Sequence, residues 1–561
     1  MAAGVENAGV NADQQAPQPA PKEVRTRILQ VAAAVLIPVA VLVIVEFSLR
    51  IAGVGFDTSL LVPCTVKGTP ASCYNLFFAT PYFPAGMVQT PRLYSIPKTK
   101  PPGTYRIFVL GESAAMGDPD SAYGFSRYLE VMLRERFPSM KFEVVNTGSV
   151  AINSHVVLRI AEGLADQKPD LFIIYSGNNE VVGPYGPGTM LTSVGMSMPV
   201  VRASIFFRST RIGQMVTKLG TKKREWHGME MFLDQQVPAN SPLLPQAYSN
   251  YDSNLRQTIR VAQAAGAQVI VSTVATNLKD CAPFASQHRK VLNSAERRAW
   301  FTFVVEGDSE LASQPGQAMT RYQQAAAIDD GYAELEFRMA RAALGLGDYK
   351  VAKQHFIRAR DLDTLRFRAD SKINEINRSV AASSGAALVD AEKILADAAP
   401  DGIIGTEQIY EHVHMTPEGN YRLARAIFAE IAPKLAKGSQ LTEPVSEADC
   451  DRLLALTGFD RWRLANEMFG RLQKAPFTNQ MNHTEQLLHF AWASEPPRED
   501  PNETVAQYQW AIARDPEDAM LHLRFGGFLF PYNRNAAAEQ ISMAQPWDGY
   551  PMFLPDGTQV R

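Results

Sequence analysis

The sequence predicts an α/β protein built on a doubly wound, parallel five-stranded sheet. Short apolar runs typical of buried strands recur through the middle of the chain, and amphipathic segments of helical period separate them. Glycine and polar residues follow several of these runs. Because parallel strands need a crossover connection, usually a helix, this alternation favours a parallel sheet with helices on both faces.

Size and charge limit the classes of function. A chain of 561 residues is long enough for roughly three or four domains. Its 55 basic and 58 acidic residues leave a net charge of -3, which gives no electrostatic reason to expect a nucleic-acid partner. The four cysteines do not stand at zinc-site spacing. We therefore expect no bound metal and no cofactor.

The N-terminal region predicts one membrane-spanning helix. Residues 1–21 are mostly small, polar or proline, and we expect a disordered tail over residues 1–27. Residues 28–49 are apolar except for Gln30 and Glu46, which lie near the two ends. A helix of this length crosses a hydrocarbon core of about 30 Å, and a helix that is apolar on every side is hard to place in a soluble domain.

Flanking charges predict the orientation of this helix. Lys22, Arg25 and Arg27 precede it, and basic residues favour the cytoplasmic side. No clear small-residue cleavage site precedes Arg50. We therefore expect a single-pass anchor with a cytoplasmic tail, and an extracytoplasmic, periplasmic location for the rest of the chain.

Residues 50–103 are expected to form a juxtamembrane lead-in that packs on the next domain. They are rich in proline, glycine and tyrosine and lack a sustained period. Cys64 and Cys73 lie within this segment. In an oxidising compartment these two residues could close a local disulfide, or they could remain free thiols in a loop.

Strands and helices alternate from there on. An amphipathic helix at 125–137 lies between the first two apolar runs, and another at 420–436 closes the region. A long insertion after the fourth strand divides this α/β domain into a first part, 104–290, and a second part, 379–437. The predicted strands are YRIFVL (105–110), FEVVN (142–146), PDLFIIYSG (169–177), AQVIVSTVATN (267–277) and AALVDAEKI (386–394).

The insertion, 291–378, and the C-terminal region, 438–561, are helical by pattern. Both resemble tetratricopeptide repeats (TPR), although Thr364 stands where that motif usually has proline. Because about three stacked repeats are needed for an independent solenoid, these helices are expected to pack on the sheet domain or on each other, and the resemblance implies a protein partner. The matching residues are Ala340, Ala352, Phe356 and Ala359 in the insertion, and Tyr508, Ala511, Pro516, Phe525 and Gly526 in the C-terminal region.

Reactive side chains follow four of the predicted strands. The first strand leads into LGES, which ends at Ser113, the second into NTGSVAINSH, the third into YSGNNE, and the loop after the fifth holds EHVHMTPEGN. Since open α/β sheets bind ligands beyond the carboxyl ends of their strands, these loops are expected to meet. A serine at such a corner is either an exposed nucleophile or a helix cap.

In order and content the four segments resemble the blocks of the SGNH hydrolases, the GDSL-type esterases and lipases. The resemblance implies that Ser113 is the nucleophile, His414 the general base, and Glu411 the carboxylate that orients the imidazole. It also implies an oxyanion hole made of the Ser113 N–H, the N–H near Ala151 and the Asn179 side chain.

The sequence departs from this family pattern in several places. Ala151 stands where the family usually has glycine, so the backbone there must adopt a conformation that alanine tolerates. Asn178 competes with Asn179 for the oxyanion hole, and His412 competes with His414, although Ile409, three residues before His412, cannot supply an acid. Glutamate replaces aspartate in three blocks, at Glu112, Glu180 and Glu411.

Three further segments are INSHVVLRIA (152–161), GNNEVVGPYGPG (177–188) and TNLKDCAPFASQHR (276–289). With them the chain resembles, over residues 28–435, membrane-anchored bacterial SGNH proteins with TPR segments. This resemblance implies no settled substrate. The leading hypothesis is a membrane-anchored serine hydrolase that cleaves ester bonds, including O-acetyl esters, through an acyl-enzyme. Two alternatives stay open. The same site could pass the acyl group to an envelope glycan as an O-acyltransferase, or the chain could be a catalytically silent TPR scaffold. The insertion is expected to form a lid or docking wall over Ser113, because it leaves the sheet at a carboxyl strand end.

Overall fold

The computed structural model describes residues 21–84, 86–89, 91–192, 196–220, 225–436, 443–497 and 500–560. The chain forms two compact units. One combines Met1–Phe56 with Phe207–Gly220, and the other combines Asp57–Phe206 with Thr221–Arg561. Most of the predicted N-terminal tail, residues 1–20, lies outside the described residues.

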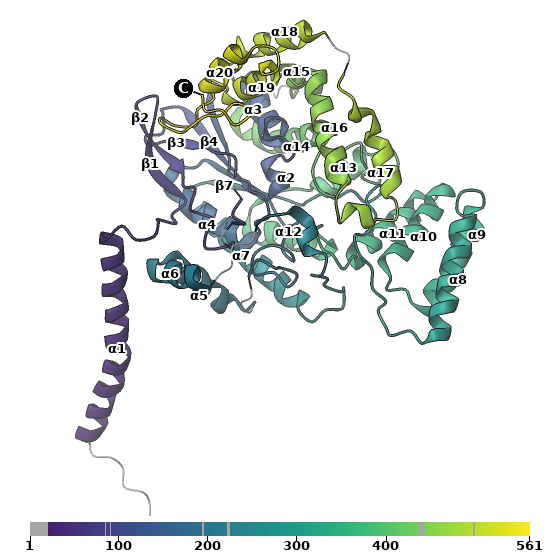
Figure 1. Ribbon diagram of the computed structural model, residues 1–561, viewed down its shortest axis with the longest axis horizontal. Coiled ribbons are helices and arrows are strands. Elements are labelled where there is room, and N and C mark those ends of the chain that lie inside the picture. The colour runs from purple at the N-terminus through teal and green to yellow at the C-terminus, as the bar shows by residue number, and fades with distance from the viewer. Residues whose placement is uncertain are drawn as a thin grey trace, which may run out of the picture. The chain divides into compact units, whose positions relative to one another are not determined.

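The first unit contains the predicted span. Helix α1 (Pro21–Ile51), the long purple helix of Figure 1, is long and apolar enough over Thr26–Ile51 to cross a membrane. The most apolar part of this stretch is not buried inside the described structure. The helix begins at Pro21, so residues 21–27 of the predicted tail are helical in the described structure. Proline favours the first turn of a helix, where its missing N–H costs nothing. The unit also contains α6 (Arg211–Gly220).

The second unit begins with a small antiparallel sheet in the segment predicted as an irregular lead-in. Its strands lie in the order β1-β2-β3. Cys64 on β1 and Cys73 on β2 form a disulfide with a Cα–Cα distance of 5.9 Å, which decides between the two alternatives left open above. The strands are β1 (Leu61–Val66), β2 (Thr69–Tyr74) and β3 (Ser95–Pro97).

The main sheet has five parallel strands, as predicted, and they lie in the order β5-β4-β6-β7-β8. The last strand is shorter than the predicted 386–394, because the Asp390 side chain accepts a hydrogen bond from the N–H of Lys393 and caps α13 (Ala391–Ala398). The strands are β4 (Thr104–Gly111), β5 (Lys141–Asn146), β6 (Leu171–Tyr175), β7 (Gln268–Ser272) and β8 (Ala387–Val389).

Helices flank this sheet in two groups (Figure 1). The first group is α3, α13 and α14, and the second is α4, α7 and α12. The central strands β4 and β6 are buried almost completely, which explains their continuous apolar sequences. The flanking helices not yet bounded are α3 (Phe125–Arg136), α4 (Ser154–Leu164), α7 (Leu244–Ala264), α12 (Ser371–Ser384) and α14 (Pro417–Ala436).

The insertion forms consecutive helices that pack on their neighbours. Residues at its TPR-like positions share a buried cluster with Leu278, Ala282 and Ile403 of the sheet domain. The insertion therefore packs on the α/β domain, whereas its identity as TPR and its role as a lid remain predictions. Its helices are α8 (Ser294–Glu310), α9 (Pro315–Ile328), α10 (Ala333–Gly345) and α11 (Tyr349–Leu362).

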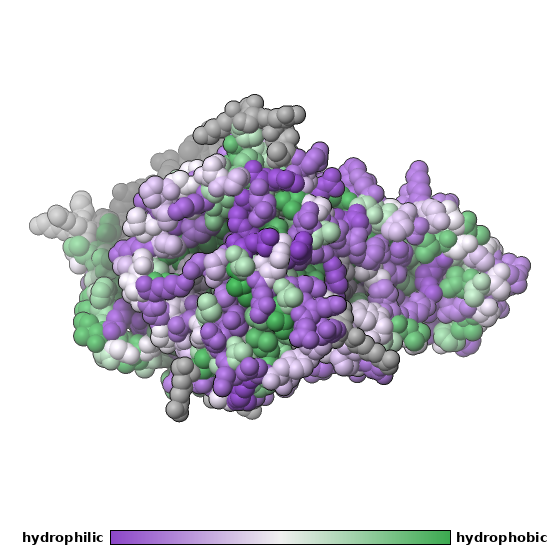
Figure 2. All heavy atoms as spheres, turned by 90° about the horizontal axis from the view of Figure 1, so that it is seen from above, coloured by the Kyte–Doolittle hydropathy of each residue, from purple (hydrophilic) through white to green (hydrophobic). Residues whose placement is uncertain are grey.

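The C-terminal region is helical, as predicted. Tyr508 stacks on Phe525 with ring centroids 5.2 Å apart. In the view of Figure 2, hydrophilic residues are interspersed with small groups of hydrophobic ones. The helices are α15 (Glu447–Leu453), α16 (Gly458–Leu472), α17 (His483–Phe490), α18 (Pro501–Ile512), α19 (Ala519–Leu529) and α20 (Arg534–Met543). Among the described residues, the other α-helices are α2 (Ser113–Met116) and α5 (Met198–Ser209).

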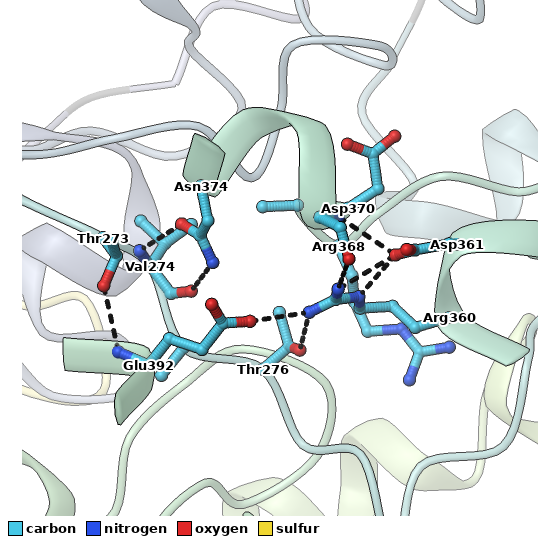
Figure 3. Close-up of polar contacts among 12 residues, drawn as sticks. Thr273, Val274, Thr276, Arg360, Asp361, Arg368, Asp370, Asn374 and Glu392 are labelled. Atoms are coloured by element: carbon cyan, nitrogen blue, oxygen red, sulfur yellow. Dashed lines mark hydrogen bonds and ion pairs between the residues drawn. The ribbon is translucent and has the colours of Figure 1, made fainter. Parts of the chain in front are cut away.

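A buried arginine fixes the return of the insertion to the sheet (Figure 3). Arg360, near the end of α11, donates hydrogen bonds to Glu392 Oε1 at 3.2 Å and to Ser371 Oγ at 2.8 Å. The N–H of Glu392 in turn donates to Thr273 Oγ1 at 3.0 Å (Figure 3). Because these residues come from α11, α12, α13 and the end of β7, the network holds four elements at the carboxyl edge of the sheet.

Candidate active site

A sharp corner at the end of β4 presents Ser113. Gly111 ends the strand with a φ of 153°, and a Cβ there would lie 1.9 Å from the carbonyl oxygen of Tyr175 on the neighbouring strand β6. Only glycine permits so close an approach. Two residues later Ser113 begins α2, where it is only partly buried. The fold thus exposes this hydroxyl at the carboxyl edge of the sheet.

The loop between α13 and α14 brings His414 to this corner. Ser113 Oγ lies 2.8 Å from His414 Nε2, and the buried Glu411 carboxylate accepts a hydrogen bond from His414 Nδ1. Because Nδ1 carries the proton, Nε2 is available to accept the proton of the serine hydroxyl. Three residues predicted from two separate motifs therefore meet in one hydrogen-bonded chain.

Backbone contacts hold the histidine loop in place. The N–H of Tyr410 donates to the carbonyl of His414 at 2.8 Å, and Ile409 and Met415 form a β-bridge. Glu411 Oε2 accepts from the N–H of Val413 at 3.0 Å. Backbone contacts within the loop therefore hold Glu411 in place independently of its contact with the imidazole.

Charge and burial set the protonation of this chain. Burial alone would raise the pKa of Glu411, but His412 and His414 outweigh it and hold the pKa of Glu411 well below its usual range. Burial lowers the pKa of His414, yet the negative charges of Glu411 and Asp118 outweigh that effect and raise it. The arrangement therefore favours a carboxylate next to a basic imidazole.

Two polar residues beside the imidazole were missed by the sequence analysis. Asp118 Oδ2 lies 3.3 Å from His414 Nε2. Arg471 on α16 donates two hydrogen bonds to the Asp118 carboxylate, one of them from Nη2 to Oδ1 at 2.9 Å. Asp118 follows the serine closely, but no motif marks it, and Arg471 lies in the C-terminal region, where no spacing relates it to the four strand-end segments.

The predicted oxyanion-hole residues lie on adjoining loops. Ala151 has a φ of 60°, the left-handed conformation that glycine usually supplies. Asn179 Nδ2 donates to the carbonyl of Ile152 at 3.1 Å, so this amide lies against the Ala151 loop. Asn178 instead accepts at Oδ1 from the N–H of Ala369 at 3.2 Å. This geometry favours Asn179 over Asn178, and its role stays a prediction.

The other two substituted glutamates join strand-end loops. Glu112 accepts hydrogen bonds from Ser176 Oγ at 2.7 Å and from the N–H of Gly177 at 2.9 Å. Glu180 accepts from the Oγ and N–H of Ser154 at 2.7 and 2.8 Å. Burial raises the pKa of Glu112 to about 7 and that of Glu180 to about 8. Both carboxyls position the loops of the site.

Other reactive side chains nearby have structural surroundings. His155 Nδ1 lies 3.0 Å from Asn254 Nδ2, and burial lowers the pKa of His155 to about 4. Burial raises the pKa of the Cys281 thiol to about 11, which disfavours a reactive thiolate. Glu411, His412 and His414 place one ligand atom each within 4.8 Å of one another, so they could hold a metal, but two of them already bond to each other.

Comparison with known proteins yields structural similarities only. No protein-family model and no curated protein matches the sequence. The structure is similar to a lipase/acylhydrolase from Enterococcus faecalis, with 10% identity over 61% of this chain and 100% of that one, and a TM-score of 0.26. It is also similar to an acetyl xylan esterase from Geobacillus stearothermophilus, with 12% identity over 58% and 94% of the two chains and a TM-score of 0.27.

A third similar structure is an α/β hydrolase enzyme from the metagenome of Lake Arreo, Spain. It has 14% identity over 62% of this chain and 96% of that one, and a TM-score of 0.27. These values carry no argument about substrate or mechanism. The function proposed below therefore rests on the geometry of the site.

Proposed function

We propose that the protein is a membrane-anchored serine hydrolase of SGNH type that cleaves acyl esters, including O-acetyl esters, in an extracytoplasmic compartment. The observation that carries this proposal is the hydrogen-bonded chain from Ser113 through His414 to Glu411. A catalytically silent scaffold would not require this alignment. The apolar helix α1 supports the anchor, and the Cys64–Cys73 disulfide supports an oxidising location.

In the proposed reaction, His414 Nε2 takes the hydroxyl proton as Ser113 Oγ attacks the ester carbonyl. Glu411 keeps Nδ1 protonated and stabilises the imidazolium that forms. The N–H groups of Ser113 and Ala151 and the amide of Asn179 stabilise the oxyanion, each donor contributing about 3 kcal/mol. The imidazolium then protonates the leaving alcohol, and water activated by the same imidazole releases the acyl group.

Fluorophosphonate labelling tests the proposed nucleophile. The full-length protein in detergent should react with the probe, because the imidazole activates the serine oxygen that attacks phosphorus. Ser113→Ala and His414→Ala should each lose the labelling. Ser309→Ala, which removes an exposed serine of α8, should label like the parent protein. A folded parent protein that does not label would contradict the proposal and favour the scaffold.

The acid limb of the pH–rate profile should respond oppositely to two substitutions. Activity needs neutral His414, so kcat/KM falls as the pH drops through the pKa of His414, which lies above its usual value. Asp118→Asn removes a charge that raises this pKa, so the limb should move to lower pH. Arg471→Gln removes a charge that lowers the pKa of His414, so the limb should move to higher pH.

Profiles of kcat/KM against pH, measured with a soluble acetyl ester, report these shifts. On the acid limb, kcat/KM of each variant should differ severalfold from that of the parent protein. Glu467→Gln is the matched control. Glu467 also accepts a hydrogen bond from Arg471, at 2.6 Å, but its removal leaves the Asp118–Arg471 pair in place. Shifts of the same sign in both test variants would show that Asp118 and Arg471 do not act through the charge of His414.

A further inference from the structure

An acidic residue in the apolar helix α1 has specific partners. Glu46 accepts hydrogen bonds from the backbone N–H groups of Arg211 at 3.0 Å and Ile212 at 3.1 Å, the first two residues of α6. It also pairs with Arg50 Nε at 2.9 Å. An ionisable residue in a membrane span is costly unless it is paired. Here the carboxylate meets the positive end of a helix dipole, which binds anions well.

A second contact fixes α6 to the chain that leaves α1. Gln214 exchanges two hydrogen bonds with the backbone of Phe56, at 2.9 and 3.0 Å. Gly55 has a φ of 72°, and a Cβ there would lie 2.4 Å from Gln214 Oε1. Contacts at Glu46 and Phe56 therefore dock α6 at the C-terminal end of α1, within one compact unit.

One face of α6 is apolar, and most of it is exposed. Ile212, Met215, Val216 and Leu219 stand at the spacing that places residues on one side of a helix. Met215 is 44% exposed, Val216 53% and Leu219 87%. In water, other parts of the protein usually cover an apolar helix face. A helix at a membrane surface instead buries this face among acyl chains.

We propose that α6 is an interfacial helix that lies in the headgroup region of the bilayer, with this apolar face, defined by Ile212, Met215, Val216 and Leu219, in the acyl chains. Glu46 lies five residues before the end of α1, about 7 Å along its axis, which places the start of α6 near the boundary between headgroups and acyl chains. The exposed Lys218 suits anionic headgroups. The lipid around α1 would continue over this face, so two segments far apart in sequence contact the membrane.

This inference rests on the proposed membrane span of α1 but not on the proposed chemistry. Its test uses the full-length protein in vesicles of phosphatidylcholine and phosphatidylglycerol. Val216→Cys carries an environment-sensitive fluorophore, and lipids with a nitroxide near the headgroup quench it on contact. Val291→Cys is the matched control, since Val291 is 96% exposed outside this unit. Leu36→Cys with a nitroxide deep in the acyl chain tests the span itself. Cys281 and Cys450 are buried, and the parent protein measures their background labelling.

We expect shallow nitroxide lipids to lower the fluorescence at residue 216 at least about twofold and to leave residue 291 unchanged. Equal behaviour at the two positions would overturn the inference. A label at 216 that is shielded from aqueous iodide but not quenched by nitroxide lipid would also overturn it, because a protein would then cover the face. A label at residue 36 that deep nitroxide lipids do not quench would reject the membrane span on which the inference rests. Fluorophosphonate labelling separately reports the state of the catalytic site.

Discussion

Glu411→Gln is expected to lower kcat/KM for ester hydrolysis by roughly 10³- to 10⁴-fold without unfolding the protein. The Glu411 carboxylate accepts from His414 Nδ1 and from the N–H of Val413. An amide in its place can donate to Nδ1, which favours the tautomer with the proton on Nε2. That tautomer cannot take the proton of Ser113. Steady-state hydrolysis of an acetyl ester measures the loss, and circular dichroism checks the fold.

Glu407→Gln is the control for this effect. Glu407 lies on the same loop and accepts a hydrogen bond from the N–H of Gly405 at 3.2 Å, but it does not contact the imidazole in the described structure. Its substitution should leave kcat/KM within a few-fold of the parent. If Glu411→Gln kept more than about a tenth of the activity, another group would have to orient His414.

Gly111→Ala is expected to destabilise the α/β domain by about 4 kcal/mol or more, which is large for one substitution. The added Cβ would lie 1.9 Å from the backbone oxygen of Tyr175 and 2.6 Å from Ala115 Cβ. Gly111 and Tyr175 are paired in the parallel ladder between β4 and β6. Relief of the clash therefore requires separation of the two central strands. Urea denaturation followed by circular dichroism measures the change in the unfolding midpoint.

Gly470→Ala provides the comparison. Gly470 lies within α16, and a Cβ there meets no atom within 4 Å. Within a helix, alanine is more favourable than glycine by up to about 1 kcal/mol. This variant should therefore be as stable as the parent protein or slightly more stable. A Gly111→Ala protein that unfolds at the midpoint of the parent would mean that the β4 corner can relax, and that the exposure of Ser113 does not depend on glycine.

Local signals in the chain predicted the main sheet but not the smaller elements. The central strands β4 and β6 could be predicted because both of their faces are covered, so their sequences are continuously apolar. β3 has only three residues and pairs with β2 across a long loop, so no period reveals it. The prediction extended the last strand to residue 394, because a cap at Asp390 depends on local geometry that apolar content does not report.

The sequence by itself determined the apolar span, the alternation of strands and helices, and the order of the loops that hold Ser113, Glu411 and His414. These features follow from periodicity and from the rule that parallel strands end at one edge. Only the tertiary structure decided that Arg471 holds Asp118 beside the imidazole and that Glu46 docks α6. Each of these contacts joins residues far apart in the chain, and the packing of whole helices, which no local pattern encodes, sets the distance between them.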